Sequence, residues 1–267
     1  MPDSVFTSAV FMCHAPIVIP SMGGSRAGQC AATTAAMRGA AKALVDSAPS
    51  RVIVFNPHTI CSPNAYTCVD MPSSIRGDFK AFGRPDLTIG FPAEPAFYKY
   101  LAQCAVDNHI AIEVLEMGEL DHGAMVPLWF LQEAGYGGPV CVLGFPWRAS
   151  QETHTDFGRF LRQACGRYEG RTAIIASGDM SHRLQQGAPS GYHPRAHEFD
   201  EAFRLHVEAG ELAEASHLAV ALRDLAAEDA SESMAISAGA LGEKVAGVEL
   251  LSYEAPFGVG YLVAVLA

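Results

Sequence analysis

Short apolar runs rich in β-branched residues alternate along the chain with longer stretches whose apolar positions recur at helical spacing. The short runs predict strands at residues 5–12, 51–56, 110–115, 140–145, 172–176, 248–253 and 260–265. The longer stretches predict helices at residues 27–47, 125–134, 153–167, 195–208 and 234–245. This alternation is typical of an α/β fold in which helices flank a mostly parallel central sheet.

Residues 69–91 interrupt the alternation because they are rich in Pro, Gly, Ser and Asp. This composition predicts an excursion over the surface near the functional site. The chain shows no internal repeat and no linker, and 267 residues fit within one large α/β domain. We therefore expect a single domain over residues 1–267.

Composition and charge narrow the class of partner. The formal net charge of -11 argues against binding to nucleic acid or to an anionic membrane surface, since both recruit basic proteins. No apolar stretch is as long as a transmembrane helix, and residues 1–20 lack the basic start of a signal peptide. The seven cysteines show no CxxC spacing, which favours reduced thiols and a cytoplasmic location.

Four histidines follow apolar runs or turn residues at the expected ends of strands. His14 and His58 follow the first two predicted strands, His182 follows the strand at 172–176, and His122 precedes a predicted helix. Ligands of open α/β sheets bind beyond the carboxyl ends of the strands, so these side chains are expected to converge. Each histidine alone is more typical of a hydrogen-bonded loop residue. Together they suggest two roles, metal ligand and proton transfer, because neutral imidazole serves both.

Several motifs resemble one enzyme family over almost the whole chain. They are CHAPIVIP, VIVFNPH, LDHGAMVPL, ASGDMSH, GYHPRAHEFD and LSYEAPFGVGYLVA, which lie between residues 13 and 264. The order of DHG-x-x-x-PL and SGD-x-SH is the most specific feature. The sequence resembles the LigB-type (class III) extradiol ring-cleavage dioxygenases, and within them the LigB-like domain of Memo-related proteins.

The resemblance implies roles for the four histidines. His14 and His58 match the iron ligands of the family. His122 and His182 match residues that stand beside the metal and handle protons and oxygen. Asp121 and Asp179 precede such motif histidines and are candidates to orient them, although turn or capping chemistry explains these two aspartates equally well.

The resemblance also implies a glutamate ligand near the start of a late helix, in the segment LAAEDASESMAISAGALGE. The spacing back from Gly239 favours Glu228 as this ligand, and Glu232 fits other relatives almost as well. For either glutamate the ordinary alternative is a favourable charge at the amino end of a helix.

Two histidines and one carboxylate on one face of a metal are the ligand set of non-haem iron(II) oxygenases. The expected cofactor is therefore Fe(II), with Zn(II) or Mn(II) as alternatives. The expected activity is extradiol cleavage of a catechol-like or aminophenol-like ring with O₂. A zinc-dependent hydrolase on the same ligands and a Memo-like metal-binding or peptide-binding protein without dioxygenase activity are the competing hypotheses. The presence of both His122 and His182 favours catalysis.

Two expectations concern assembly. Self-association into a homo-oligomer follows from its frequency among soluble proteins. A small helical partner subunit is implied by the resemblance, since some relatives are paired with one.

Overall fold

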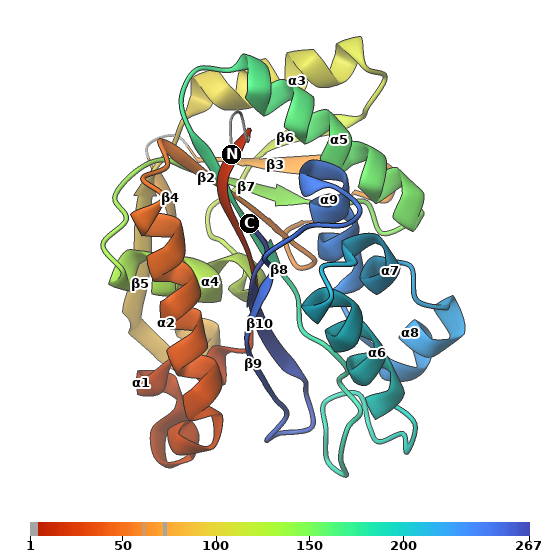
Figure 1. Cartoon of the computed structure of the whole chain (residues 1–267). Helices are drawn as coiled ribbons and strands as arrows, with labels where there is room; N and C mark the ends of the chain where they lie inside the picture. The colour runs from red at the N-terminus through yellow and green to blue at the C-terminus, as the bar shows by residue number, and fades with distance from the viewer. Residues whose placement is uncertain (1–4, 61, 72–73) are drawn as a thin grey trace.

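The computed structural model describes residues 5–60, 62–71 and 74–267, and within them eight strands form one sheet (Figure 1). The spatial order is β6-β3-β7-β2-β8-β1-β10-β9. The strands are β1 (Phe6–Met12), β2 (Arg51–Asn56), β3 (Tyr66–Asp70), β6 (Ile112–Glu116), β7 (Val140–Gly144), β8 (Thr172–Ser177), β9 (Glu249–Glu254) and β10 (Tyr261–Val265). Strands β7, β2, β8 and β1 run parallel in the middle. On either side of them, β10 is antiparallel to both β1 and β9, and β3 is antiparallel to β7. The expected α/β fold with a mostly parallel sheet is confirmed.

Helices cover both faces of this sheet. They are α1 (Pro20–Gly23), α2 (Ala31–Asp46), α3 (Pro95–Asp107), α4 (His122–Glu133), α5 (Gln151–Arg167), α6 (His197–Glu208), α7 (Leu212–Ser216), α8 (Val220–Ala226) and α9 (Ser231–Leu241). Helices α2 and α4 pack on one face, and α5 and α9 pack on the other (Figure 1). In the described part of the chain, no helix is both long and apolar enough to cross a membrane.

Several expected bounds were wrong, and each has a local cause. Residues 24–30 form a 3-10 helix, so α2 begins later than predicted. Helix α9 ends at Leu241 and does not reach residue 245, because the next residue, Gly242, has a φ of 126° that leaves the helical region. Strand β3 and helices α3, α7 and α8 were not predicted.

The described part of residues 69–91 is packed structure, which corrects the expected surface excursion. Strands β4 (Ser74–Phe79) and β5 (Arg84–Pro92) form an antiparallel hairpin against α4. Ile75, Phe79 and Phe91 from this hairpin are buried in the core. Because α4 begins at a predicted site histidine, the hairpin lies beside the functional region.

Two glycines allow α5 and α9 to touch through their backbones. A β-carbon on Gly158 would overlap the carbonyl oxygen of Ile236, and one on Gly239 would overlap that of Thr155. Larger side chains would push the helices apart. This close contact fixes the position of α9, whose amino end reaches the carboxyl ends of the strands.

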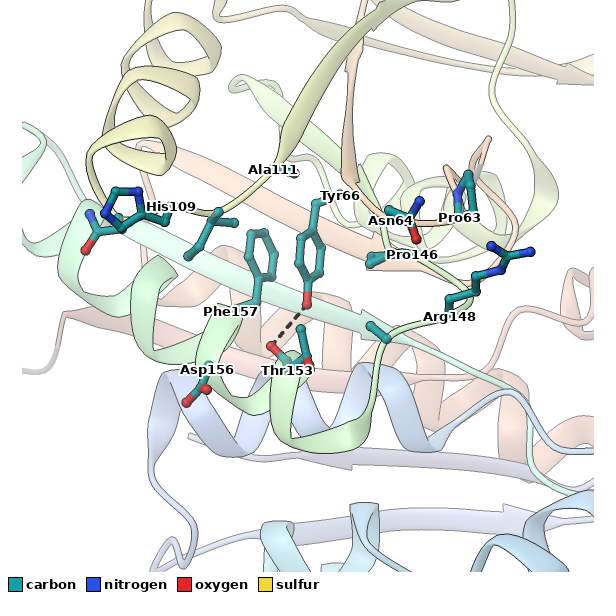
Figure 2. A pocket seen from close by; sticks show the side chains of 13 residues that line it. Pro63, Asn64, Tyr66, His109, Ala111, Pro146, Arg148, Thr153, Asp156 and Phe157 are labelled. Atoms are coloured by element: carbon teal, nitrogen blue, oxygen red, sulfur yellow. Dashed lines mark hydrogen bonds between the residues drawn. The ribbon is translucent and has the colours of Figure 1, made fainter.

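A cavity of about 510 Å³ lies between the start of β3 and the first turns of α5 (Figure 2). Tyr66 and Phe157 stack at its wall with ring centroids 3.5 Å apart. The Tyr66 hydroxyl donates a hydrogen bond to the carbonyl oxygen of Thr153 at 3.2 Å, so this polar group is already paired. The described residues that line the cavity include none of the four predicted site histidines.

Asp200 on α6 is a buried carboxylate that links α6 to β9 and to the loop after β8. It is 1% exposed and accepts hydrogen bonds from the Tyr253 hydroxyl at 2.7 Å and from the Ser181 N–H at 2.9 Å. Burial raises the pKa of Asp200 to about 6, although these two hydrogen bonds act in the opposite direction. The ionised carboxylate is therefore less favourable in the folded chain than in the unfolded one.

The raised pKa predicts that Asp200 stabilises the fold most at acidic pH. This contribution is complete below the unfolded pKa of about 4 and is lost as the pH rises through about 6. Asp200→Asn cannot titrate, so its free energy of unfolding relative to wild type should rise by about 2–3 kcal/mol from about pH 4 to about pH 7. Urea unfolding at both pH values measures this change. An equal change in Glu201→Gln, an exposed control on the same helix, would contradict the prediction.

Candidate metal centre and active site

Neighbouring parallel strands bring the predicted site residues to one edge of the sheet. His14 follows β1, His58 follows β2 and Asp179 follows β8, and these strands lie side by side in the order β2-β8-β1. His122 is the first residue of α4, and Asp229 lies two residues before the start of α9. The convergence expected at the carboxyl ends of the strands is thus present.

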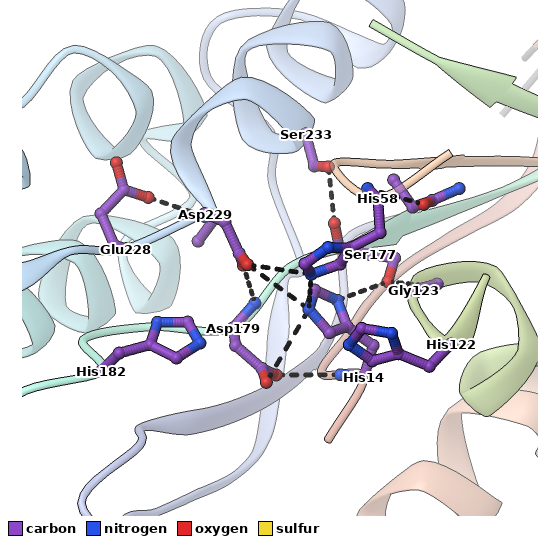
Figure 3. A network of polar contacts seen from close by, with 12 residues as sticks. His14, His58, His122, Gly123, Ser177, Asp179, His182, Glu228, Asp229 and Ser233 are labelled. Carbon is purple, nitrogen blue, oxygen red and sulfur yellow. Dashed lines mark hydrogen bonds and ion pairs between the residues drawn. The ribbon is translucent and has the colours of Figure 1, made fainter. Parts of the chain in front are cut away.

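His14, His58 and His122 form a compact group in which one ring nitrogen of each lies within 4.8 Å of the others. The Nε2 atoms of His14 and His58 are 3.1 Å apart. Asp229 Oδ2 lies 3.5 Å from His14 Nε2 and 3.4 Å from His58 Nε2. Figure 3 shows these side chains pointing toward one another.

The spacing of these atoms fits one metal ion. Donors bound at about 2.0–2.2 Å to the same ion stand roughly 3.0–3.5 Å apart at octahedral and tetrahedral angles. The three separations among His14, His58 and Asp229, from 3.1 to 3.5 Å, fall within this range. Two imidazoles and a carboxylate also suit a divalent transition metal chemically. The residues present therefore fit the metal that the sequence predicts.

Hydrogen bonds fix the tautomer of His14. Its Nδ1 lies 3.0 Å from Ser177 Oγ, which donates its own proton to the carbonyl oxygen of Gly123 at 2.6 Å. That carbonyl is available because Pro127, four residues later in α4, has no N–H to donate to it. Since the Ser177 proton is used, His14 Nδ1 must be the donor, and Nε2 faces His58 and Asp229.

The site is built to hold positive charge. Burial opposes a charged imidazole, but Asp179 and Asp229 overcome it and raise the pKa of His14 to about 9. Burial likewise opposes a charged Asp229, yet His14 and His58 hold the pKa of Asp229 well below its usual range. A bound cation would replace the proton on His14 as the partner of these carboxylates.

A tight turn and a glycine position His58. The side-chain oxygen of Asn56 accepts the N–H groups of His58 at 3.0 Å and Thr59 at 2.9 Å, which orders the loop after β2. A β-carbon on Gly123 would lie 2.8 Å from this oxygen and 3.0 Å from the His58 ring. Gly123 therefore lets the start of α4 approach the His58 loop.

His122 and His182 are held by different partners. His122 Nδ1 lies 2.8 Å from Asp121 Oδ1, so Asp121 both orients this ring and caps α4 through Gly123 N–H. His182 lies on the other side of Asp229 from the three-histidine group (Figure 3). Its Nδ1 lies 2.8 Å from the carbonyl oxygen of Ala227, which can only accept, so Nδ1 carries the proton and Nε2 is free to accept one.

The sequence suggested that Asp179 could orient His182, and this expectation was wrong. Its Oδ1 accepts the N–H of His14 at 2.9 Å, and its Oδ2 lies 3.8 Å from His14 Nε2. Asp179 is thus a partner of His14, whereas backbone carbonyl groups near the end of α8 hold His182.

The structure does not bring the two glutamates favoured by the sequence to the histidines. The Glu228 side chain is 1% exposed and accepts from Arg223 Nε at 2.5 Å and from the N–H groups of Ala230 and Ser231 at 2.7 and 2.8 Å. Glu232 accepts from Arg223 Nη2 at 2.5 Å. Figure 3 shows the Glu228 carboxylate turned away from the histidines.

The carboxylate that does reach the histidines is Asp229, which sequence reasoning missed. It is the next residue after Glu228 and lies in the same acidic segment. Its position just before an apolar helix at the carboxyl edge of the sheet was visible in the sequence. Counting back from Gly239 could not decide between Glu228 and Asp229. Consecutive side chains in a loop point in different directions, and the count of residues does not tell which of them faces the histidines.

The site is accessible from one side. The His14 side chain is 1% exposed, whereas those of His58 and His122 are 35% and 25% exposed. The ring of Phe82, near the tip of the β4–β5 hairpin, lies edge-on to His122 with centroids 5.4 Å apart, and Phe82 is 44% exposed. A small molecule reaching the buried histidine would pass these side chains.

Two curated proteins are similar to this chain in sequence. The chain is 29% identical over 258 residues to Protein CA_C1420 of Clostridium acetobutylicum, covering 93% of this chain and 54% of that protein. It is 24% identical over 164 residues to a 3,4-dihydroxyphenylacetate 2,3-dioxygenase of Escherichia coli, covering 56% of each. The chain thus spans about half the length of the curated relatives it matches.

A solved structure and a family model match nearly the whole chain. The uncharacterized protein JW3007 of Escherichia coli K12 shares the fold with a TM-score of 0.67 at 16% identity, covering 97% of this chain and 99% of that one. The model of the catalytic LigB subunit of aromatic ring-opening dioxygenase matches residues 8–264. The resemblance seen in the motifs is confirmed, and the chain belongs to the family of LigB catalytic subunits of aromatic ring-opening dioxygenases.

Proposed function

We propose that this protein is an extradiol dioxygenase that binds Fe(II) through His14, His58 and Asp229 and cleaves a catechol-like or aminophenol-like ring with O₂. The observation that carries the proposal is the group of two imidazoles and one carboxylate with donor atoms 3.1–3.5 Å apart. Family membership supports the reaction class. These residues would hold Fe(II) with positions open for the two adjacent hydroxyl or amino substituents of the substrate, and the metal would supply an electronic connection between the ring and O₂.

The two remaining histidines supply proton transfer in this proposal. His182 Nε2 is free to accept a proton from a substrate hydroxyl, since its Nδ1 is committed to Ala227. His122 stands within the three-histidine group with its Nδ1 held by the Asp121 carboxylate, so its Nε2 can accept a hydrogen bond from a substrate hydroxyl. In the overall reaction one ring C–C bond breaks and both atoms of O₂ enter the product, so no further reductant is required.

A metal-dependent hydrolase is the second candidate, and one observation favours it. His14, His58 and His122 together form a three-histidine group within 4.8 Å, which is a ligand set of catalytic zinc with a fourth position for water. The two candidates differ in metal and co-substrate. Ring cleavage requires Fe(II) and consumes O₂, whereas hydrolysis would proceed with Zn(II) under anaerobic conditions.

A cytoplasmic location belongs to the same proposal. The six described cysteines are unpaired, although Cys68 and Cys141 Sγ lie 3.7 Å apart on neighbouring strands. Close thiols that stay reduced are favoured in a reducing compartment.

The first prediction from this site concerns metal binding. His14→Ala, His58→Ala and Asp229→Asn each remove one donor, so each variant should lose stoichiometric iron after anaerobic reconstitution while keeping the wild-type circular dichroism spectrum. Elemental analysis after gel filtration measures the bound metal. Asp156→Asn, an exposed carboxylate on α5, is the matched control and should retain full occupancy. Full occupancy in His14→Ala or His58→Ala would refute the ligand assignment.

The second prediction separates proton transfer from metal binding. His122→Phe and His182→Phe should retain iron and lose roughly a hundred- to ten-thousand-fold in kcat, because positioned acid and base groups contribute about that much. Oxygen uptake with a panel of catechols and aminophenols measures turnover. His217→Phe, an exposed histidine after α7, should behave like wild type. Loss of iron in His182→Phe would instead make His182 a ligand.

The third prediction concerns Phe82 as a contact for the substrate ring. Aromatic pairs contribute about 0.5–1.5 kcal/mol beyond buried area, so Phe82→Ala should lower kcat/KM for an aromatic diol by roughly two- to tenfold with iron content unchanged. Trp147→Ala is the control variant, since it removes another exposed aromatic side chain, 62% exposed, while the contact of Phe82 with His122 stays in place. Equal kinetics for Phe82→Ala and wild type would show that the hairpin tip does not contact the substrate.

A further inference from the structure

The loop between α8 and α9, residues 227–230, contacts both the group of His14 and His58 and the separate His182. Asp229 Oδ2 lies 3.4–3.5 Å from the Nε2 atoms of His14 and His58. Two residues earlier, the carbonyl oxygen of Ala227 accepts from His182 Nδ1 at 2.8 Å. A small displacement of this loop would therefore move the carboxylate at the proposed metal site and the orientation of His182 together.

Glu228 is the side chain that anchors this loop. Its Oε1 accepts from Arg223 Nε at 2.5 Å, and its Oε2 accepts the N–H groups of Ala230 at 2.7 Å and Ser231 at 2.8 Å. Arg223 is fixed in turn by Glu232, at 2.5 Å from its Nη2. The anchor thus joins the end of α8 to the first turn of α9 through a carboxylate that is 1% exposed.

We propose that Glu228, held by Arg223, is a positioning residue that sets Asp229 and the Ala227 carbonyl in place for the metal and for His182. The inference rests on the proposed function, since it assigns a role to a residue behind that same site. Its basis is the opposite orientation of two consecutive side chains: Glu228 points toward Arg223 and Asp229 points toward the histidines (Figure 3). Fixing the first side chain restricts the second, because both leave the same short stretch of backbone.

Direct metal ligation by Glu228 would require this anchor to break. Both oxygens of Glu228 already accept hydrogen bonds, one of them from a guanidinium that is 15% exposed. Removing one partner of a buried ion pair leaves the other charge uncompensated, which is strongly unfavourable. Groups behind a metal ligand typically change metal affinity by about 10- to 100-fold when they are removed.

Cobalt(II) binding, followed by visible absorption under anaerobic conditions, tests the inference without requiring turnover. Glu228→Gln and Arg223→Met should each weaken Co²⁺ binding by about 10- to 100-fold. At saturating Co²⁺ both variants should show the wild-type spectrum, because the ligands are unchanged. Asp229→Asn should bind weakly with an altered spectrum, because it loses a ligand.

A second buried ion pair provides the matched control. Arg51 Nε and Nη2 donate to Glu94 at 2.8 and 3.0 Å, and Arg51 lies at the start of β2, at the opposite end of this strand from His58. Glu94→Gln should lower the melting temperature and leave Co²⁺ affinity unchanged. A drop in affinity equal to that of Glu228→Gln would show that general destabilisation, not positioning, explains the effect.

Two further outcomes overturn the inference. Wild-type Co²⁺ affinity in Glu228→Gln would remove its positioning role. A saturated Glu228→Gln spectrum like that of Asp229→Asn, with no effect of Arg223→Met, would make Glu228 itself a ligand. If Glu228→Gln does not fold, Arg223→Lys replaces the two-point contact with a single one and should still weaken binding.

Failure of the proposed function is separately visible. If wild type binds no Co²⁺, or if His58→Ala binds it as tightly as wild type does, the metal site itself is refuted. The role of Glu228 is refuted on its own when wild type binds Co²⁺ through His58 and the anchor variants bind it equally well.

Discussion

The buried imidazole of His14 is the group on which the geometry of the site depends. Its Nδ1 is bound to Ser177, its backbone N–H to Asp179, and its Nε2 faces His58 and Asp229. These partners come from the ends of β8 and β2 and from the loop before α9, and His14 itself follows β1. A single side chain therefore ties together segments that are far apart in sequence, and the order of β2, β8 and β1 in the sheet makes this possible.

The electrostatics of the site follow from that burial. An uncompensated charge on His14 would be costly in the interior, and the carboxylates of Asp179 and Asp229 compensate it. The same carboxylates would repel each other without a cation between the loops that carry them. A divalent ion satisfies both requirements, because it accepts the Nε2 lone pair and balances negative charge.

The sequence predicted the parts of this structure that depend on local pattern. Seven strands, the main helices and the convergence of His14, His58 and His122 follow from apolar periodicity and from placement at strand ends. Strand β3 was missed because it has only five residues and ends at Asp70, and the β4–β5 hairpin was missed because its strands contain Asp, Gly and Pro. Packing of Ile75, Phe79 and Phe91 against the core stabilises the hairpin, and periodicity carries no information about that contact.

The carboxylate shows where sequence reasoning stopped. Glu228, Asp229 and Glu232 lie within five positions, and motif spacing alone favoured Glu228. Which of them faces the histidines depends on Arg223, since this guanidinium engages both glutamates and leaves Asp229 as the side chain directed into the site. Arg223 lies in the preceding helix, and the spacing from Gly239 takes no account of it.

The length of Asp229 is matched to a close approach of two loops. An aspartate is one methylene shorter than the glutamate implied by the family resemblance, so its backbone must lie nearer to the imidazoles. Gly178 permits this, because a β-carbon there would lie 2.7 Å from Ala230 Cα and 3.0 Å from the Asp229 carbonyl oxygen. Reciprocal contacts then join the loops: Asp179 N–H donates to Asp229 Oδ1 at 2.6 Å, and Asp229 N–H donates to the Asp179 carbonyl at 3.2 Å. A glutamate at position 229 would carry its carboxylate past the imidazoles unless the loop withdrew, and withdrawal would break these contacts. The short Asp229 side chain, the glycine opposite it and the ion pair of Glu228 with Arg223 therefore lie in one continuous set of contacts.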